Sequence, residues 1–286
     1  MRISFEFFPP RTAQGRTNLA RTAARLHAAG PEFFSVTYGA GGSTRDRTFE
    51  TVQTLCGAGF GTAPHLSWGD DDAAAIDRRI ADYLEMGVSR LVALRGDIPP
   101  GPGSQPKVRY AEELVAHVRE CFGDSLQIEV GCYPEIHPNA PSPDADIAFL
   151  KRKVDAGANS CITQYFYNPD SYFFFVDQCR ERGIAVPIVA GIMPITNYEG
   201  LTRFSDNCGA EIPRWIRLRL EAYRDDADSL RAFGEEVVTD LCAKLLGGGA
   251  PGLHFYTLNR APPTLAILRR LNLLQDTQPV QRVAET

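Results

Sequence analysis

Short apolar runs alternate with longer segments of helical periodicity along most of the chain. Runs of roughly four to eight apolar, β-branched or aromatic residues are typical of buried strands, whereas apolar residues three or four positions apart predict amphipathic helices. Eight runs predict strands, at 3–8, 33–38, 61–68, 90–96, 127–133, 160–166, 186–192 and 252–258. The clearest helical segments lie between them, at 17–30, 72–87, 110–122 and 144–158.

Eight strand–helix units in 286 residues match a (β/α)8 barrel in number and in length. A doubly wound open sheet is the alternative, but its G-x-G-x-x-G motif is absent after the first strand, where the sequence reads FEFFPPR. The segment 197–247 is longer than one crossover needs and predicts two or three helices before the eighth strand. We therefore expect an α/β fold, a (β/α)8 TIM barrel, forming one catalytic domain over residues 1–286 with an elaborated helical segment before strand 8.

Composition narrows the class of partner and the compartment. The formal net charge is −5 and the basic residues are dispersed, which argues against a nucleic-acid partner. The chain shows no signal-peptide pattern and no apolar run near the ~18 residues that span a bilayer, so we expect no membrane partner. Seven cysteines without a C-x-x-C pair argue against a disulfide framework or a structural zinc site. A reducing cytoplasm is the expected location.

Polar side chains gather at the carboxyl ends of the predicted strands. In a (β/α)8 barrel these ends carry the chemistry. The residues found there are Glu6, Thr37, Tyr38, His65, Arg95, Asp97, Tyr133, Glu135, His137, Gln164, Tyr256, Asn259 and Arg260. The strand starts carry mainly apolar or unremarkable residues. This asymmetry predicts a site on the rim formed by the carboxyl ends.

Glu6 is unusual because it lies among phenylalanines in SFEFFPP. A carboxylate in an apolar strand needs a partner or a task, so it forms either a structural ion pair with an arginine of a neighbouring strand or part of a site. His65 and His137 follow predicted strands, and each is either a structural residue with its hydrogen bonds satisfied or a catalyst. Neither has a second histidine or a cysteine at ligand spacing, so no metal site is predicted.

Two further groups of charged residues lie in or just before predicted helices. Arg152 and Lys153 in the segment 144–158 are either solvated helix charges or ligands of a phosphate-bearing cofactor. Asp71 and Asp72 precede the segment 72–87, where we expect them to cap the helix.

Eight motifs arrive in order along the chain: SFEFFPPR, SVTYGAGGSTRDRT, APHL, ALRGDIPP, CYPEIHP, LKRKVDAGAN, ITQYFY and HFYTLNRA. Together they resemble the methylenetetrahydrofolate reductase family, flavin enzymes built on a (β/α)8 barrel, from the first strand to about residue 272. The resemblance implies that NADH or NADPH reduces bound FAD, which then reduces 5,10-methylenetetrahydrofolate to 5-methyltetrahydrofolate. It also implies ping-pong kinetics and a supply of methyl groups for methionine synthesis.

The resemblance further implies the roles of individual residues. Glu6 matches the general acid, and Asp97 matches a catalytic carboxylate that contacts both cofactor and folate. Asp97, Gln164, Phe204 and Arg260 match substrate-binding positions. The positions that match contacts to FAD or the nicotinamide nucleotide are Thr37, Tyr38, Ala40, His65, Arg95, Gly96, Asp97, Tyr110, Ala111, Tyr133, His137, Ala140, Asp146, Arg152 and Lys153.

Some features depart from the family pattern or stay open. Gly200 stands where relatives often carry a glutamine near folate, and Phe149 where they carry an asparagine near FAD. The family implies a homo-oligomer, and the length of the chain predicts no regulatory domain and no inhibition by S-adenosylmethionine. A flavin barrel with another substrate and a folate-binding subunit without flavin are the alternatives. The sequence does not distinguish NADH from NADPH.

Overall fold

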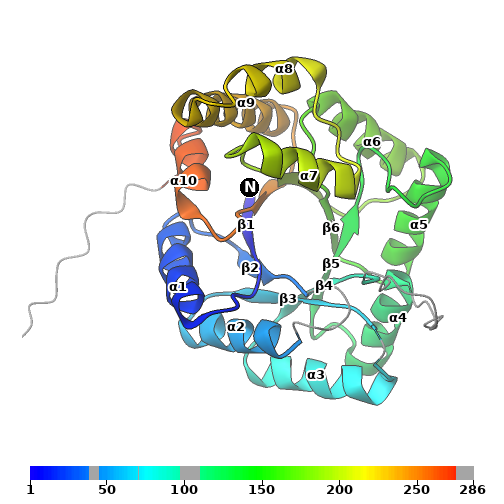
Figure 1. The fold of residues 1–286 in the computed structure, drawn as a ribbon. Helices are drawn as coiled ribbons and strands as arrows, with labels where there is room; N and C mark the ends of the chain where they lie inside the picture. Colours follow the sequence, from blue (N-terminus) through cyan, green and yellow to red (C-terminus); the bar gives the residue numbers. More distant parts are fainter. Residues whose placement is uncertain (39–44, 70, 97–109, 275–286) are drawn as a thin grey trace, which may run out of the picture.

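Eight parallel strands close into a barrel in chain order, with β8 hydrogen-bonded to β1 (Figure 1). The computed structural model describes residues 1–38, 45–69, 71–96 and 110–274. The strands are β1 (Arg2–Phe7), β2 (Phe33–Val36), β3 (Thr62–Leu66), β4 (Arg90–Ala93), β5 (Gln127–Cys132), β6 (Ser160–Thr163), β7 (Ile188–Ile192) and β8 (Gly252–Tyr256). All eight lie within the predicted runs or extend them by one residue, and the predicted (β/α)8 barrel is confirmed.

The described helices surround the barrel and connect its strands. They are α1 (Ala13–His27), α2 (Arg45–Gly57), α3 (Ala73–Glu85), α4 (Ala111–Phe122), α5 (Pro143–Asp155), α6 (Pro169–Glu181), α7 (Tyr198–Cys208), α8 (Arg214–Ala222), α9 (Ala227–Gly247) and α10 (Ala261–Arg270). None of these helices combines the length and the low polarity needed to cross a lipid bilayer. Asp72 caps α3 as predicted, because its side chain accepts a hydrogen bond from the backbone N–H of Ala75 at 2.8 Å.

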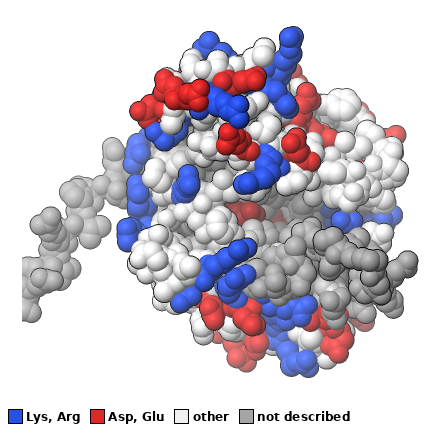
Figure 2. Space-filling view, viewed as in Figure 1, with Lys and Arg blue, Asp and Glu red and all other residues white. Residues whose placement is uncertain are grey.

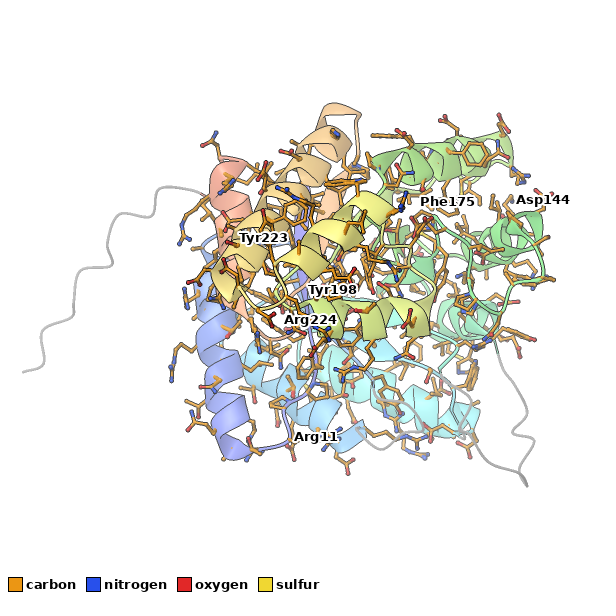
Figure 3. All side chains as sticks on the ribbon, turned by 45° about the horizontal axis from the view of Figure 1, so that its top comes forward. Arg11, Asp144, Phe175, Tyr198, Tyr223 and Arg224 are labelled. Atoms are coloured by element: carbon orange, nitrogen blue, oxygen red, sulfur yellow. The ribbon has the colours of Figure 1, made fainter. Side chains whose placement is uncertain are left out.

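Three helices, α7, α8 and α9, precede β8, in agreement with the predicted elaboration. Helix α9 packs against α6, α10 and β7, so it takes the place of a barrel helix. Helix α7 lies across the carboxyl end of the barrel instead (Figure 1). Arg224, which follows α8, forms an ion pair with Glu199 of α7 at 3.1 Å (Figure 3). The hydroxyl groups of Tyr165 and Ser205 lie 3.0 Å apart and join α7 to the segment after β6.

Alternation along β1 separates the phenylalanines from the polar residues. Phe5 and Phe7 are fully buried, and their rings lie 5.7 and 5.3 Å from that of Phe34 in the layer between barrel and helices. Ser4 and Glu6 point into the barrel, because successive side chains of a strand face opposite sides. Glu6 and the buried side chains of Phe5 and Phe7 therefore extend from opposite faces of β1.

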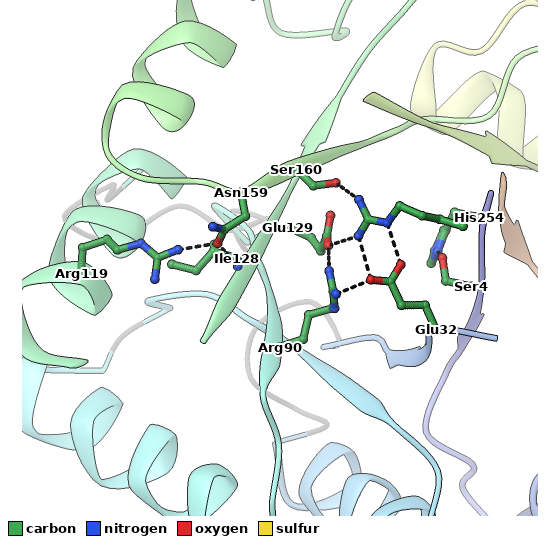
Figure 4. Close-up of polar contacts among 10 residues, drawn as sticks. Ser4, Glu32, Arg90, Arg119, Ile128, Glu129, Asn159, Ser160 and His254 are labelled. Carbon is green, nitrogen blue, oxygen red and sulfur yellow. Dashed lines mark hydrogen bonds and ion pairs between the residues drawn. The ribbon is translucent and has the colours of Figure 1, made fainter. Parts of the chain in front are cut away.

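The amino-terminal end of the barrel holds a network of charged side chains around the buried Glu129 (Figure 4). Arg2 donates to Glu32 at 2.6 Å, to Glu129 at 3.0 Å and to the hydroxyl of Ser160 at 2.9 Å. Arg90 forms ion pairs with the same two carboxylates. The side chain of Glu129 is fully buried. The expectation that strand starts carry unremarkable residues is wrong, because β1 and β4 both begin with an arginine that points into the barrel.

Candidate active site

A cavity of about 490 Å³ lies at the carboxyl end of the barrel. Figure 2 shows the hollow at the middle of this face, where mostly uncharged residues form the described part of its wall. Seven of the predicted site residues line the cavity: Glu6, Thr37, Tyr38, His65, Tyr133, Gln164 and Phe204. Tyr256, one of the predicted strand-end residues, lines it as well, and so do residues that sequence analysis did not assign to the site, among them Gly131, Tyr165, Asn207, Cys208 and His254.

Glu6 lies near the carboxyl end of β1, where it lines the cavity, and its side chain is one-fifth exposed. Its Oε2 atom lies 3.5 Å from Nε2 of His65 and 3.8 Å from Nε2 of His254. Among the described residues, these two histidines are the basic side chains within 4 Å of the carboxylate, and Tyr256 is a further ionisable neighbour. Within the part of the chain that the structure describes, Glu6 therefore forms no ion pair with an arginine of a neighbouring strand, which was the alternative interpretation.

His65 is uncharged at neutral pH. Burial lowers its pKa from 6.5 to about 4; nearby Glu6 opposes this effect, while His254 adds to it. The Nε2 atom of His65 is buried and has no hydrogen-bond partner among the described residues. A buried polar atom without a partner is rare in proteins, so this atom of the cavity lining needs a partner that the described residues do not supply.

His254 and Tyr256 extend the polar wall from β8. His254 is buried, and its Nδ1 atom lies 2.7 Å from the hydroxyl of Ser4. Tyr256 donates to the carbonyl of Thr163 at 2.7 Å, and burial raises its pKa above its usual value. A Cβ at Gly191 would lie 2.0 Å from that same carbonyl and 2.8 Å from the tyrosine ring, so this contact requires glycine on β7.

The segment after β8 holds the backbone around Glu6 in place. The hydroxyl of Thr257 donates to the carbonyl of Glu6 at 2.6 Å. The amide side chain of Asn259 accepts from the backbone N–H of Phe8 at 3.0 Å and donates to its carbonyl at 2.9 Å. Arg260, the predicted folate ligand, follows as the exposed residue before α10 and is not among the residues that line the cavity.

The segment after β5 brings two predicted cofactor residues together. The rings of Tyr133 and His137 meet edge to face with their centres 4.5 Å apart. The backbone N–H of Asn139 donates to Nδ1 of His137 at 3.0 Å, so in the neutral ring Nε2 carries the proton and is a donor. The carboxylate of Asp146 accepts from the backbone N–H of His137 at 2.8 Å. Burial raises the pKa of Tyr133 to about 12 and lowers that of His137.

The two basic residues of α5 that were predicted to bind the cofactor point in different directions. Lys153 donates to the carbonyl of Gly131 at the cavity floor. Arg152 pairs with Glu112 of α4 at 3.1 Å and lies over the ring of Phe149 at 4.6 Å. Arg152 is therefore held between two helices in this structure, while Lys153 reaches the barrel.

The remaining predicted residues lie around the rim. Tyr38 accepts from Arg79 at 3.2 Å, and Arg79 also pairs with Asp71 at 2.8 Å. Asp71, which Arg45 contacts as well at 2.6 Å, joins two helices and does not cap α3, so its predicted role is wrong.

The other predicted cofactor residues lie at the ends of β4, α4 and the segment after β5. Gly96 follows β4 with φ 83°, Tyr110 and Ala111 begin α4, and Ala140 donates to the carbonyl of His137 at 2.8 Å. Arg95 donates to the carbonyl of Gly96 at 3.4 Å. Asp97 and Ala40 lie outside the described residues.

Gln164 and Phe204 are two predicted folate contacts that face the cavity. The side-chain oxygen of Gln164 accepts from the backbone N–H of Tyr165 at 3.0 Å, which leaves the amide nitrogen as a donor. Phe204 on α7 is 39% exposed, so its ring can contact a molecule that enters the cavity.

One group of potential metal ligands lies between α3 and α4, outside the cavity lining. The ligand atoms of Asp77, His117 and Cys121 lie within 4.8 Å of one another. Nε2 of His117 lies 2.7 Å from the carboxylate of Asp77, so these two residues are already hydrogen-bonded to each other.

Comparison with known proteins gives a consistent result. The family model for methylenetetrahydrofolate reductase matches residues 1–272. The 5,10-methylenetetrahydrofolate reductase of Salmonella typhimurium is 41% identical over 272 residues, which cover 95% of this chain and 90% of that protein. A probable methylenetetrahydrofolate reductase (NADH) of rice is 40% identical over 293 residues, covering 96% of this chain and 49% of that protein.

A solved structure has the same fold. An uncharacterized protein from Clostridium thermocellum that binds two copies of 5-methyl-5,6,7,8-tetrahydrofolic acid superimposes with a TM-score of 0.64. The match covers 96% of this chain and 94% of that protein at 15% identity. At this identity the likeness establishes the fold alone.

Proposed function

This chain belongs to the methylenetetrahydrofolate reductase family, and from that premise we propose that it reduces 5,10-methylenetetrahydrofolate to 5-methyltetrahydrofolate with FAD as its cofactor. The reductant is NADH or NADPH. The observation that carries this proposal is the position of Glu6 on the wall of the barrel cavity, beside an uncharged His65 and with the Gln164 amide on the same cavity wall.

The residues around the cavity fit a flavin ring. The cavity offers apolar contacts from Val92, Leu94 and Ile162. One residue of the lining, His65, has a buried Nε2 atom without a hydrogen-bond partner among the described residues. When bound, FAD supplies reversible hydride transfer between the reductant and the folate. Tyr133, His137 and Lys153 would hold the cofactor from the β5 side, and Thr37, Tyr38 and Arg95 from the β2 and β4 sides.

Glu6 acts as the general acid for the folate. Its carboxyl group gives a proton to a ring nitrogen of 5,10-methylenetetrahydrofolate as the C–N bond of the five-membered ring breaks, which leaves a cationic carbon that accepts hydride. Because His65 is uncharged, it forms no ion pair with Glu6. The contact of Thr257 with the carbonyl of Glu6 keeps the acid at a constant position.

Gln164, Phe204 and Arg260 are the proposed folate ligands, and Asp97 is a second catalytic carboxylate. The Gln164 amide supplies directional hydrogen bonds, and Phe204 supplies a ring that stacks on a flat substrate. The rice relative is named as an NADH enzyme, which supports NADH as the reductant. Ping-pong kinetics follow if reductant and folate use the same cavity in turn. A homo-oligomer, a cytoplasmic location and a role in methionine synthesis stay predictions from the sequence.

Purification and anaerobic reduction test the proposal. We expect a yellow protein that absorbs at about 450 nm, loses this absorbance with NADH and regains it with 5,10-methylenetetrahydrofolate, while 5-methyltetrahydrofolate forms. A colourless protein that binds folate but cannot be loaded with FAD would instead be a folate-binding subunit. A protein that NADH bleaches but the folate does not reoxidise would be a flavin enzyme with another substrate.

A further inference from the structure

Gly131 is an inward-facing residue near the end of β5 whose glycine identity the described structure does not require. Its φ is not positive, so its backbone conformation is open to any residue. A Cβ built at this position meets no described heavy atom within 4 Å. Glycine in a strand interior costs stability, because it adds chain entropy to the unfolded state and packs no side chain.

Gly191, an inward-facing glycine on β7, shows the contrast. A Cβ there would lie 2.0 Å from the carbonyl oxygen of Thr163 and 2.8 Å from the ring of Tyr256. Packing inside the protein therefore explains Gly191 completely. Gly131 needs a different explanation, and the space that its missing side chain leaves belongs to the cavity.

The residues around Gly131 indicate what kind of molecule would fit against it. Gly131 pairs with Ile162 of β6, and Leu94, the residue after β4, lines the same cavity, so apolar groups flank the exposed backbone. Polar atoms also line the cavity, at Gln164 and at the unpartnered Nε2 of His65. The carbonyl of Gly131 is already bonded to Lys153, so this backbone oxygen is not left without a partner when an apolar surface covers it.

We propose that Gly131 is a specificity-determining position, at which the absence of a side chain lets a flat, conjugated ring pack face-on against the backbone of β5. The inference rests on the proposed function, because a flavin or the pterin of a folate is the ring that would lie there. A flat face on bare backbone and flanking aliphatic groups, with hydrogen bonds reserved for the ring edge, is the arrangement that the cavity provides.

A size series at this position tests the proposal. In Gly131→Ala, Gly131→Val and Gly131→Leu we expect the apoprotein to melt at or above the wild-type temperature, because the added atoms meet open space. The dissociation constant for FAD, measured by flavin fluorescence on the apoprotein, should rise with side-chain volume, little for alanine and about tenfold or more for leucine. Gly57→Leu is the matched control, because Gly57 also faces open space but lies exposed at the end of α2.

A second measurement, of folate binding, distinguishes a contact with the flavin from a contact with the pterin. It also separates a failure of the Gly131 proposal from a failure of the proposed cofactor. The dissociation constant for 5-methyltetrahydrofolate is measured on the same variants. Weaker binding of FAD alone assigns the contact to the flavin, and weaker binding of folate alone assigns it to the pterin. A wild-type protein that never binds FAD would refute the proposed cofactor but leave the folate arm as a test of Gly131. If Gly131→Val and Gly131→Leu are folded and bind both ligands within about twofold of wild type, the proposal for Gly131 is wrong.

Discussion

Glu6 and His65 lie 3.5 Å apart, yet burial keeps the imidazole uncharged at neutral pH. An uncharged neighbour can exchange a hydrogen bond with a carboxyl group without fixing it as an anion. The chemistry of this pair therefore depends on the molecule that enters the cavity. His254, bonded to Ser4 on its other side, completes the surroundings of the acid.

Glu6→Gln should separate the two half-reactions. Glutamine keeps the shape of the side chain but has no carboxyl proton to give, so we expect the reduction of 5,10-methylenetetrahydrofolate to slow by about 100-fold or more. The reduction of the flavin by NADH should change by less than about threefold, because that step needs no acid. Stopped-flow absorbance of each half-reaction makes the measurement, with Glu199→Gln, an exposed residue of α7, as the control. Equal losses in both half-reactions would show that Glu6 is not the folate acid.

The pKa of His65 predicts a loss of stability in mild acid. Above pH 6.5 the ring is neutral in both folded and unfolded chains and contributes nothing; as the pH falls from 6.5 toward about 4, the unfolded chain binds a proton that the folded protein resists. The free energy of unfolding of the apoprotein should therefore fall by about 2 kcal/mol more between pH 7 and pH 5 in wild type than in His65→Gln. Urea denaturation at the two pH values measures it. Parallel pH profiles of the two proteins would contradict the assigned burial.

At the scale of elements, the segment 257–260 between β8 and α10 is hydrogen-bonded to the end of β1, and we call this segment the clasp. Thr257 and Asn259 bind the backbone on either side of the end of β1, across a separation of about 250 residues in the chain. Leu258 and Asn259 have φ values of 49° and 57°, and asparagine tolerates this left-handed conformation better than most residues. The clasp places the end of β1, and with it Glu6, relative to β8.

Removing the Asn259 side chain should loosen this clasp. Asn259→Ala loses both hydrogen bonds to Phe8, so we expect it to lower the free energy of unfolding by about 1–2 kcal/mol relative to its control. Asn272→Ala is the matched control, because Asn272 has a similar φ of 55° but lies beyond α10. Urea denaturation of both variants isolates the side-chain bonds from the backbone strain. The same loss in both variants would mean that the bonds to Phe8 contribute nothing.

At the scale of the whole molecule, the two ends of the barrel differ in kind. The amino-terminal end is closed by Arg2, Arg90, Glu32 and Glu129, whereas the carboxyl end is a cavity (Figures 2 and 4). A buried ion pair gains little over an apolar core, but removing one partner leaves charge that neither water nor protein satisfies. The network therefore binds β1, β4 and β5 together at the end remote from the chemistry.

Glu129→Ala tests this structural role. It leaves two arginines without a buried carboxylate between them, and we expect a loss of about 3–5 kcal/mol in the free energy of unfolding. Asp155→Ala breaks an exposed pair with Lys151 and should cost no more than about 0.5 kcal/mol. Both values come from urea denaturation followed by circular dichroism. A loss near 0.5 kcal/mol in Glu129→Ala as well would mean that water satisfies the arginines.

The sequence by itself determined the barrel, its order of strands, the extra helices before β8, the family and the rim position of Glu6, His65, Tyr133 and Gln164. These depend on local periodicity and on the rule that barrel chemistry sits at the carboxyl ends of strands, both of which can be read along the chain. Strand alternation alone could also have placed Phe5 and Phe7 on the side away from Glu6, and His254 beside Tyr256.

Only the tertiary structure decided which side chains meet. The bonds of His254 to Ser4, of Asn259 to Phe8 and of Arg2 to Glu129 join residues between about 130 and 250 positions apart. Asp71 looked like a helix cap because its sequence neighbours fit one, and it was assigned wrongly because its true partners lie on two helices. Gly131 and Gly191 are both glycines on inward-facing strand positions, and the sequence alone does not tell them apart. Only the packing shows that the space beside Gly191 is filled by Tyr256, whereas the space beside Gly131 is open to a ligand. Contacts of this kind depend on how the barrel closes, and no local pattern of polar and apolar residues encodes that closure.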